Sequence, residues 1–126
     1  MKNVCTIYDL KDQAILDRLA MHLVLAQREG IFAYVKNFAE ADIILFFVSP
    51  ASIIDQSKVA LVSMARAEGK RVIPILVSKV SSLPSPLGDI FALPYAGTFL
   101  KTVSGAKREQ LLVEITRALY AIFARN

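Results

Sequence analysis

The chain has few of the residues that build disulfide or metal scaffolds. Its 126 residues include one cysteine, one histidine and no tryptophan. A single cysteine cannot form an internal disulfide, and one cysteine with one histidine gives too few ligands for a zinc cluster. We expect Cys5 to be a small, buried apolar side chain and His22 to serve packing or to lie at the surface. The sequence therefore predicts no metal and no cofactor.

Long apolar runs are also missing. The run of residues 43–48, like every other apolar run of the chain, is far below the roughly 20 residues that a membrane-spanning helix needs. Residues 1–4 lead directly into a strand-like segment, without the apolar stretch of a secretory signal. With the single cysteine, these features predict a cytoplasmic protein without a membrane partner.

Positive charge is in excess but is not concentrated. Fifteen Lys and Arg against 11 Asp and Glu give a formal net charge of +4. The basic residues are spread along the chain, with no basic run and no basic stripe between aromatic residues. We therefore expect a solvated surface and no nucleic-acid partner.

Apolar residues are abundant and alternate between strand-like and helix-like segments. They make up 55% of the chain, and mean hydropathy is +0.47. This composition predicts strands buried on both faces, a surface for a partner, or both. The alternation is typical of a parallel sheet covered by helices. We expect strands over residues 3–8, 31–35, 42–48, 71–77 and 98–102, and helices over 12–28, 49–67, 87–92 and 106–124.

These segments predict one α/β domain over residues 1–126. The expected architecture is a flavodoxin-like three-layer sandwich with a four- to five-stranded parallel sheet and residues 42–48 at its centre. Asp12 is expected to cap the first helix, and Ser49-Pro50 to begin the helix after the central strand.

Five segments occur in an order and spacing that matches a known pattern. Tyr8 and Asp12 fit a Ser-Tyr-Ser-x-x-Asp motif after the first strand, although Ile7 and Asp9 replace its serines. The other segments are residues 19–30, 41–50, 71–76 and 86–97. Together they resemble bacterial-type Toll/interleukin-1 receptor (TIR) domains along most of the chain. The resemblance implies a single TIR-like domain.

The chain departs from this family at the expected catalytic position. TIR domains that cleave NAD carry a glutamate in the helix after the central strand, and its place falls at about Val62. No acidic residue lies between Asp55 and Glu68, and Asp55 is about two helical turns away. A carboxylate stabilises the cationic transition state of glycosyl cleavage, and a valine cannot. We therefore predict no catalytic residue.

A second departure is a deletion. Only eight residues separate Gly30 from Ala39, whereas a helical crossover alone takes about 10–12. The second helix is therefore expected to be reduced or absent. The long BB loop, which in the family helps to build the substrate cleft and TIR–TIR contacts, is missing.

Polar residues follow the first and central strands, where ligands of open α/β sheets collect. Tyr8 ends the first strand, Asp9 and Asp12 follow it, and Ser49 and Pro50 follow the central one. These five residues are the candidate ligand-binding site. Turn and helix-cap chemistry is their alternative role.

Three functional hypotheses follow. The first is a non-catalytic TIR-like module that assembles with itself or with another TIR-like or effector protein, through an exposed sheet edge near residues 3–8. By analogy with TIR-like relatives, it would be an adaptor or scaffold in bacterial defence signalling. The second is a module that binds a nucleotide derived from NAD. The third is an enzyme, either a divergent NAD hydrolase or a nucleoside deoxyribosyltransferase-like protein.

Overall fold

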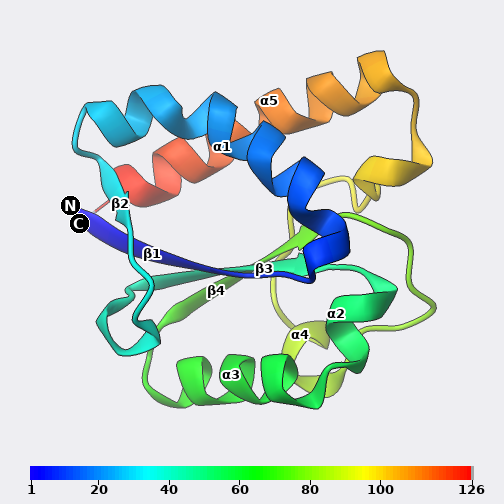
Figure 1. The fold of residues 1–126 in the computed structure, drawn as a ribbon, viewed down its shortest axis with the longest axis horizontal. Helices are drawn as coiled ribbons and strands as arrows, with labels where there is room; N and C mark the ends of the chain where they lie inside the picture. The colour runs from blue at the N-terminus through cyan, green and yellow to red at the C-terminus, as the bar shows by residue number, and fades with distance from the viewer. Residues whose placement is uncertain (126) are drawn as a thin grey trace.

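The computed structural model describes residues 1–125 and is a three-layer α/β sandwich (Figure 1). Its middle layer is a four-stranded, all-parallel sheet in the order β2-β1-β3-β4. The strands are β1 (Lys2–Ile7), β2 (Phe32–Tyr34), β3 (Ile43–Val48) and β4 (Arg71–Leu76). The flavodoxin-like fold class is therefore confirmed, with four strands.

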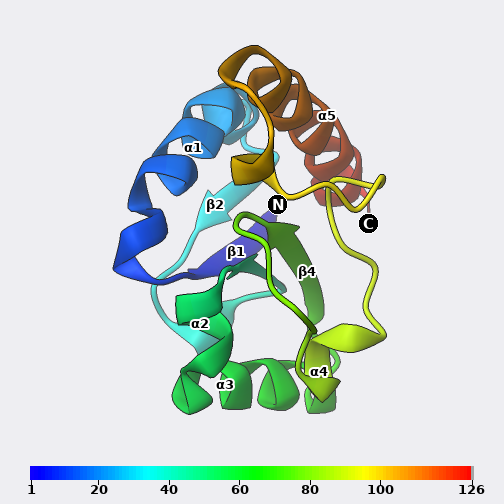
Figure 2. The same cartoon turned by 90° about the vertical axis from the view of Figure 1, so that its right-hand side faces the viewer.

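Helices cover both faces of the sheet (Figure 2). One layer contains α1 (Gln13–Arg28) and α5 (Gly105–Ala124), and the other contains α2 (Pro50–Ile54), α3 (Gln56–Ala67) and α4 (Ser85–Gly88). Short 3-10 turns occupy Leu10–Asp12 (η1), Phe38–Glu40 (η2) and Leu100–Thr102 (η3). Within residues 1–125, no helix has the length and apolar character needed to cross a bilayer.

The strand β3 is buried along its whole length, as its unbroken apolar run predicts. It pairs in parallel with β1 on one side and β4 on the other. Alternate side chains enter different cores. Ile43, Leu45 and Phe47 face α1 and α5, whereas Ile44, Phe46 and Val48 face α3. This strand therefore holds the two layers of helices together.

The short crossover after β2 leaves part of β1 unpaired on one side. The β1–β2 register ends at Val4 and Tyr34, and the chain then reaches β3 through the single turn η2. The second helix is thus reduced to one turn, as the residue count predicted. Residues 5–7 of β1 pair only with β3. This edge borders the cavity described below.

The prediction of a strand over residues 98–102 is wrong, because Leu100–Thr102 of this segment form η3. Leu100 is fully buried, and Lys101 N donates to Val77 O at 2.9 Å, so packing overrides the strand propensity of the segment. The outer edge of β4 meets Leu93 instead: Leu76 N donates to Leu93 O at 2.8 Å, and Leu93 N to Pro74 O at 2.9 Å. The helix predicted over residues 87–92 is also displaced, to Ser85–Gly88.

The helix predicted over residues 49–67 is broken at Asp55. The backbone of Asp55 is extended (φ −79°, ψ 102°), and its Oδ1 accepts hydrogen bonds from Ser57 N at 3.1 Å and Lys58 N at 3.3 Å. Hydrogen bonds from the Lys58 ammonium and then the Ser57 hydroxyl hold the pKa of the Asp55 carboxyl well below its usual range. Asp55 therefore begins α3 as its cap.

This cap predicts a pH-dependent effect of Asp55→Asn, which keeps a capping side chain and removes the charge. A depressed pKa means that the carboxylate stabilises the fold above the unfolded aspartate pKa of about 3.9 and loses this contribution as the pH falls toward the folded value. In urea unfolding, the variant should be less stable than the wild type near neutral pH, and the gap should narrow below about pH 4. Added salt should narrow it as well. A gap that is independent of pH would contradict this role.

Candidate functional site

Asp12 and Ser49 meet beyond the carboxyl ends of β1 and β3. Asp12 is 2% exposed, and its Oδ2 accepts a hydrogen bond of 2.6 Å from Ser49 Oγ. Lys101 Nζ lies 3.6 Å from the other carboxylate oxygen. Asp12 is the N-cap residue of α1, as predicted, but its carboxylate makes no capping hydrogen bond to that helix. A short, charge-assisted bond to a residue 37 positions away replaces the local cap.

Ser49 and Ser52 form a reciprocal capping box at the start of α2. Ser49 N donates to Ser52 Oγ at 3.0 Å, and Ser52 N donates to Ser49 Oγ at 3.3 Å. The Ser52 hydroxyl in turn donates to Phe47 O at 2.7 Å. The predicted helix start at Ser49-Pro50 is confirmed. Because the Ser49 hydroxyl donates a hydrogen bond to the Asp12 carboxylate, the two residues form a buried junction that fixes the end of β1 to α2.

The other three candidate residues lie apart from this junction. Asp9 Oδ2 accepts a hydrogen bond of 3.0 Å from Lys11 N and caps η1. Pro50 is exposed at the first position of α2. The ring of Tyr8 packs edge-on against Phe47, with 6.5 Å between centroids, on the face of the sheet that α1 covers. The five predicted residues therefore separate into a junction, two turn positions and one wall of a cavity.

The position expected for a catalytic glutamate lies inside the core. Val62 is fully buried between α3 and the sheet, among the apolar residues that face Phe46 and Val72. The nearest acid before it, Asp55, is engaged as the cap of α3. No group of three or more His, Cys, Asp and Glu side chains within residues 1–125 is placed to hold a metal ion.

His22 and Cys5 have structural environments. His22 Nε2 lies 3.1 Å from Glu109 Oε2, and Arg18 also pairs with Glu109, so these contacts join α1 to α5. Cys5 is buried in the core that faces α3, and this burial raises the pKa of its thiol. The thiol therefore stays protonated at neutral pH. The packing roles predicted for both residues agree with these contacts.

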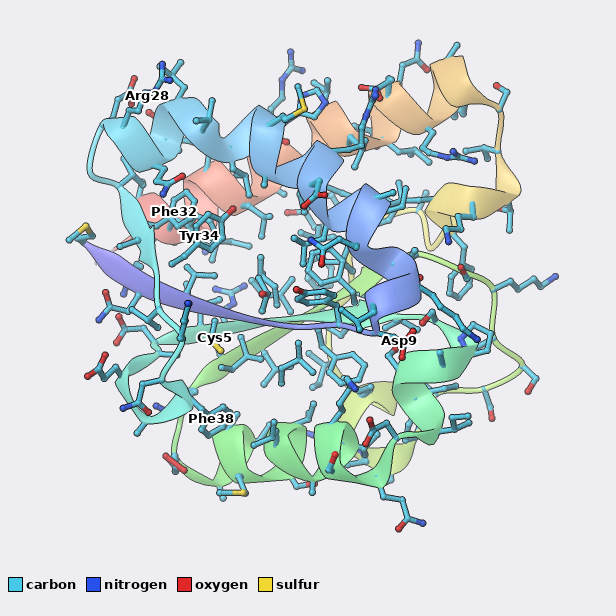
Figure 3. All side chains as sticks on the ribbon, viewed as in Figure 1. Cys5, Asp9, Arg28, Phe32, Tyr34 and Phe38 are labelled. Atoms are coloured by element: carbon cyan, nitrogen blue, oxygen red, sulfur yellow. The ribbon has the colours of Figure 1, made fainter. Side chains whose placement is uncertain are left out.

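A cavity of about 500 Å³ opens between α1 and β1, beside the end of β2. We call it the lateral cavity. Figure 3 shows Tyr34 near the end of α1 that carries Arg28, and Asp9 at the far end of β1. The walls include Val4, Thr6, Tyr8, Leu16, Ala20 and Leu23. The sequence analysis missed this cavity, although the short interval between Gly30 and Ala39 and the polar Thr6 within the first strand are signals that could have indicated it.

Apolar side chains are exposed on two opposite sides of the molecule. Met21, Val24 and Leu25 on α1, which we call the α1 stripe, are 72%, 40% and 62% exposed. Phe91 and Tyr95, which we call the aromatic pair, are 58% and 61% exposed, with 4.9 Å between ring centroids. In Figure 2, α1 lies on the left and the yellow segment that follows α4 lies on the right. Neighbouring exposed apolar side chains of this kind are candidates for contact surfaces.

Comparison with known proteins gives no match. A scan of the sequence against models of protein families matched none of them. Searches of curated proteins and of solved structures returned no match either. The chemistry of the described residues therefore carries the functional conclusion.

Proposed function

We propose that the protein is a non-catalytic interaction module, TIR-like in kind, that assembles with copies of itself. The observation that carries the proposal is the pair of exposed apolar surfaces, the α1 stripe and the aromatic pair, at opposite edges of the sheet. Burial of Val62 supports the non-catalytic part, because that position has neither a carboxylate nor access to a ligand.

The two surfaces favour head-to-tail assembly. Met21, Val24 and Leu25 follow the i, i+3, i+4 spacing that places side chains on one helix face. The aromatic pair offers a different surface on the other side of the molecule. A head-to-tail pair of copies keeps one free surface of each kind, so further copies can add and form rings or open chains. A different TIR-like or effector protein with an apolar surface would bind the free α1 stripe at one end of the chain of copies or the free aromatic pair at the other, as the resemblance to adaptors of bacterial defence implies.

Two charged variants test this assembly. Leu25→Lys should block the α1 stripe and Tyr95→Lys the aromatic pair, because each places a charge in an apolar contact. By light scattering, the wild-type mass should rise with concentration, whereas each variant alone should stay monomeric. An equimolar mixture of the two should stop at a dimer, since one intact contact remains between them. Met64→Lys, at a 52% exposed position on α3, is the matched control and should behave as the wild type.

The outcomes separate the modes of assembly. A wild-type protein that stays monomeric at high concentration would refute the proposal. An effect of Leu25→Lys with none of Tyr95→Lys would replace the head-to-tail mode by a two-fold contact through α1 alone.

The same samples test the enzymatic and nucleotide-binding alternatives. We expect no release of nicotinamide from NAD and no heat on titration with NAD or ADP-ribose, because Asp12 and Ser49 are already bonded to each other. Nicotinamide release that Asp55→Ala abolishes would overturn the non-catalytic proposal. Heat without release would instead support a nucleotide-binding module.

A further inference from the structure

We propose that the lateral cavity binds a small amphipathic carboxylate, with its apolar body between α1 and β1 and its charged head at Lys36. Lys36 stands at the mouth, just after β2. This inference does not depend on self-assembly, because the residues that line the cavity are distinct from the α1 stripe and the aromatic pair.

The size and walls of the cavity suit a medium-length apolar body. Its volume of about 500 Å³ lies within the range of roughly 300–1,000 Å³ typical of small-molecule sites. At the spacing of liquid water, this volume holds roughly fifteen non-hydrogen atoms. Along β1 the walls run from Val4 to Tyr8, a distance of about 13 Å at the rise of a strand. Leu16, Ala20 and Leu23 of α1 form the opposite, apolar wall.

The charge at the mouth selects the sign of the head group. Lys36 is exposed and is the one charged side chain among the residues that line the cavity, none of which is acidic. Within residues 1–125, Lys36 takes part in no ion pair. A ligand with a carboxylate therefore gains an ion pair at Lys36, whereas an ammonium head is repelled.

Hydroxyl groups supply free donors along the same cavity. Thr6, Tyr8 and Tyr34 line it, and their hydroxyls make no hydrogen bond within residues 1–125. None of the three is a buried polar group without a partner, so all remain open to solvent or to a ligand. The Tyr34 ring is held edge-on by Phe32 at 4.9 Å, and burial raises the pKa of its phenol. Tyr34 therefore stays a hydrogen-bond donor at neutral pH, as binding of an anionic head requires.

The short length of β2, three residues, explains why the cavity exists. Because the β1–β2 register ends at Val4, no strand covers the side of β1 that carries Thr6 within residues 1–125. The chain instead turns away through η2, whose Phe38 packs on the other core, and Figure 3 shows Cys5 and Phe38 on that side of the sheet. The deletion thus opens a side entrance to the core under α1.

Calorimetry with decanoate, below its micelle-forming concentration, tests the inference on monomeric protein. Decanoate should bind; decanol, which shares its chain but lacks the charge, should bind about two- to fivefold more weakly. Decylamine, whose ammonium head is repelled by Lys36, should bind at least tenfold more weakly than decanoate. Ala20→Phe should fill the cavity and weaken decanoate binding at least tenfold. Ala14→Phe is the matched control, because Ala14 is an exposed position of α1 outside the lining of this cavity, and it should bind as the wild type. Circular dichroism verifies that both variants fold.

A second pair of variants isolates the head group. Lys36→Gln should weaken decanoate binding about two- to fivefold, the range of an exposed ion pair, and should leave decanol binding unchanged. Lys79→Gln removes the same charge at an exposed position outside the lining and should have no effect. Absence of decanoate binding, equal binding of decanoate and decylamine, or an unchanged affinity in folded Ala20→Phe would each overturn the proposal.

Discussion

Val62→Glu is expected to destabilise the protein strongly at neutral pH and to produce no NAD cleavage. The side chain of Val62 is 0% exposed and lies in the core between α3 and the sheet. A carboxylate placed there would be buried without a partner, which costs on the order of 4 kcal/mol. Total stabilities of domains are about 5–15 kcal/mol, so this loss removes much of the fold's margin. A glutamate at this position is therefore not expected to create a hydrolase site.

The pH dependence of the stability of Val62→Glu shows whether the buried carboxylate causes the loss. Burial raises the pKa of an introduced carboxyl above its unfolded value, so the penalty is present at neutral pH and shrinks as the pH falls through the folded value. Urea midpoints of Val62→Glu should therefore approach those of the wild type in mild acid. Ala60→Glu introduces the same group at an exposed position of α3 and should change stability by less than about 0.5 kcal/mol. A stable Val62→Glu protein that releases nicotinamide would show instead that this position faces a site.

The overall fold was predictable because its strongest signals are local or are set by chain length. The apolar run of residues 43–48 indicated a strand buried on both faces, and the structure places all six side chains in the core. The eight residues between Gly30 and Ala39 left room for one turn, which is η2. Such features need no knowledge of distant contacts.

The local errors arise where a distant contact decides the structure. Leu100 lies in a segment with strand-like residues, but burial under α5 and the hydrogen bond from Arg108 Nε to Leu100 O, 2.9 Å long, favour a 3-10 turn. Asp55 falls inside an apolar pattern of helical spacing, and only its own capping bonds reveal the break. In both cases propensity was overridden by specific packing or hydrogen bonding.

The candidate site was predictable only as a location. The end of β1 and the end of β3 lie at the same edge of a parallel sheet, so Asp12 and Ser49 were expected near each other. The hydrogen bond between Asp12 and Ser49 depends on side-chain geometry, which residue spacing in the sequence does not determine. The lateral cavity lies where β2 does not pair with residues 5–7 of β1. Sequence patterns indicate which residues form strands, but they do not indicate where two strands stop pairing.

Removal of the Asp12 carboxylate should destabilise the protein strongly, although this carboxylate makes no capping hydrogen bond to α1. Asp12→Ala leaves the Ser49 hydroxyl without its acceptor in a buried place, and we expect a loss of about 2–4 kcal/mol in the free energy of unfolding. Ser49→Ala should cost about 1–3 kcal/mol, because it removes the bond to Asp12 and one side of the capping box. Asp9→Ala, which removes only the cap of a 3-10 turn, is the control and should cost about 1 kcal/mol or less.

The double variant Asp12→Ala with Ser49→Ala should lose less stability than the sum of the single losses, by about 1–3 kcal/mol, because the second substitution removes a group that the first has already left unpaired. Urea unfolding of the four proteins gives this coupling directly. Lys101→Ala should change stability by less than about 1 kcal/mol, since its side chain is 42% exposed and water competes for the ion pair with Asp12. If the Asp12 and Ser49 losses add to within about 0.5 kcal/mol, the 2.6 Å bond does not stabilise the fold, and both side chains are free to serve a ligand after all. A coupled pair instead means that the protein's own side chains occupy the place where ligands of such sheets collect, which favours the lateral cavity over this place as the site of a ligand.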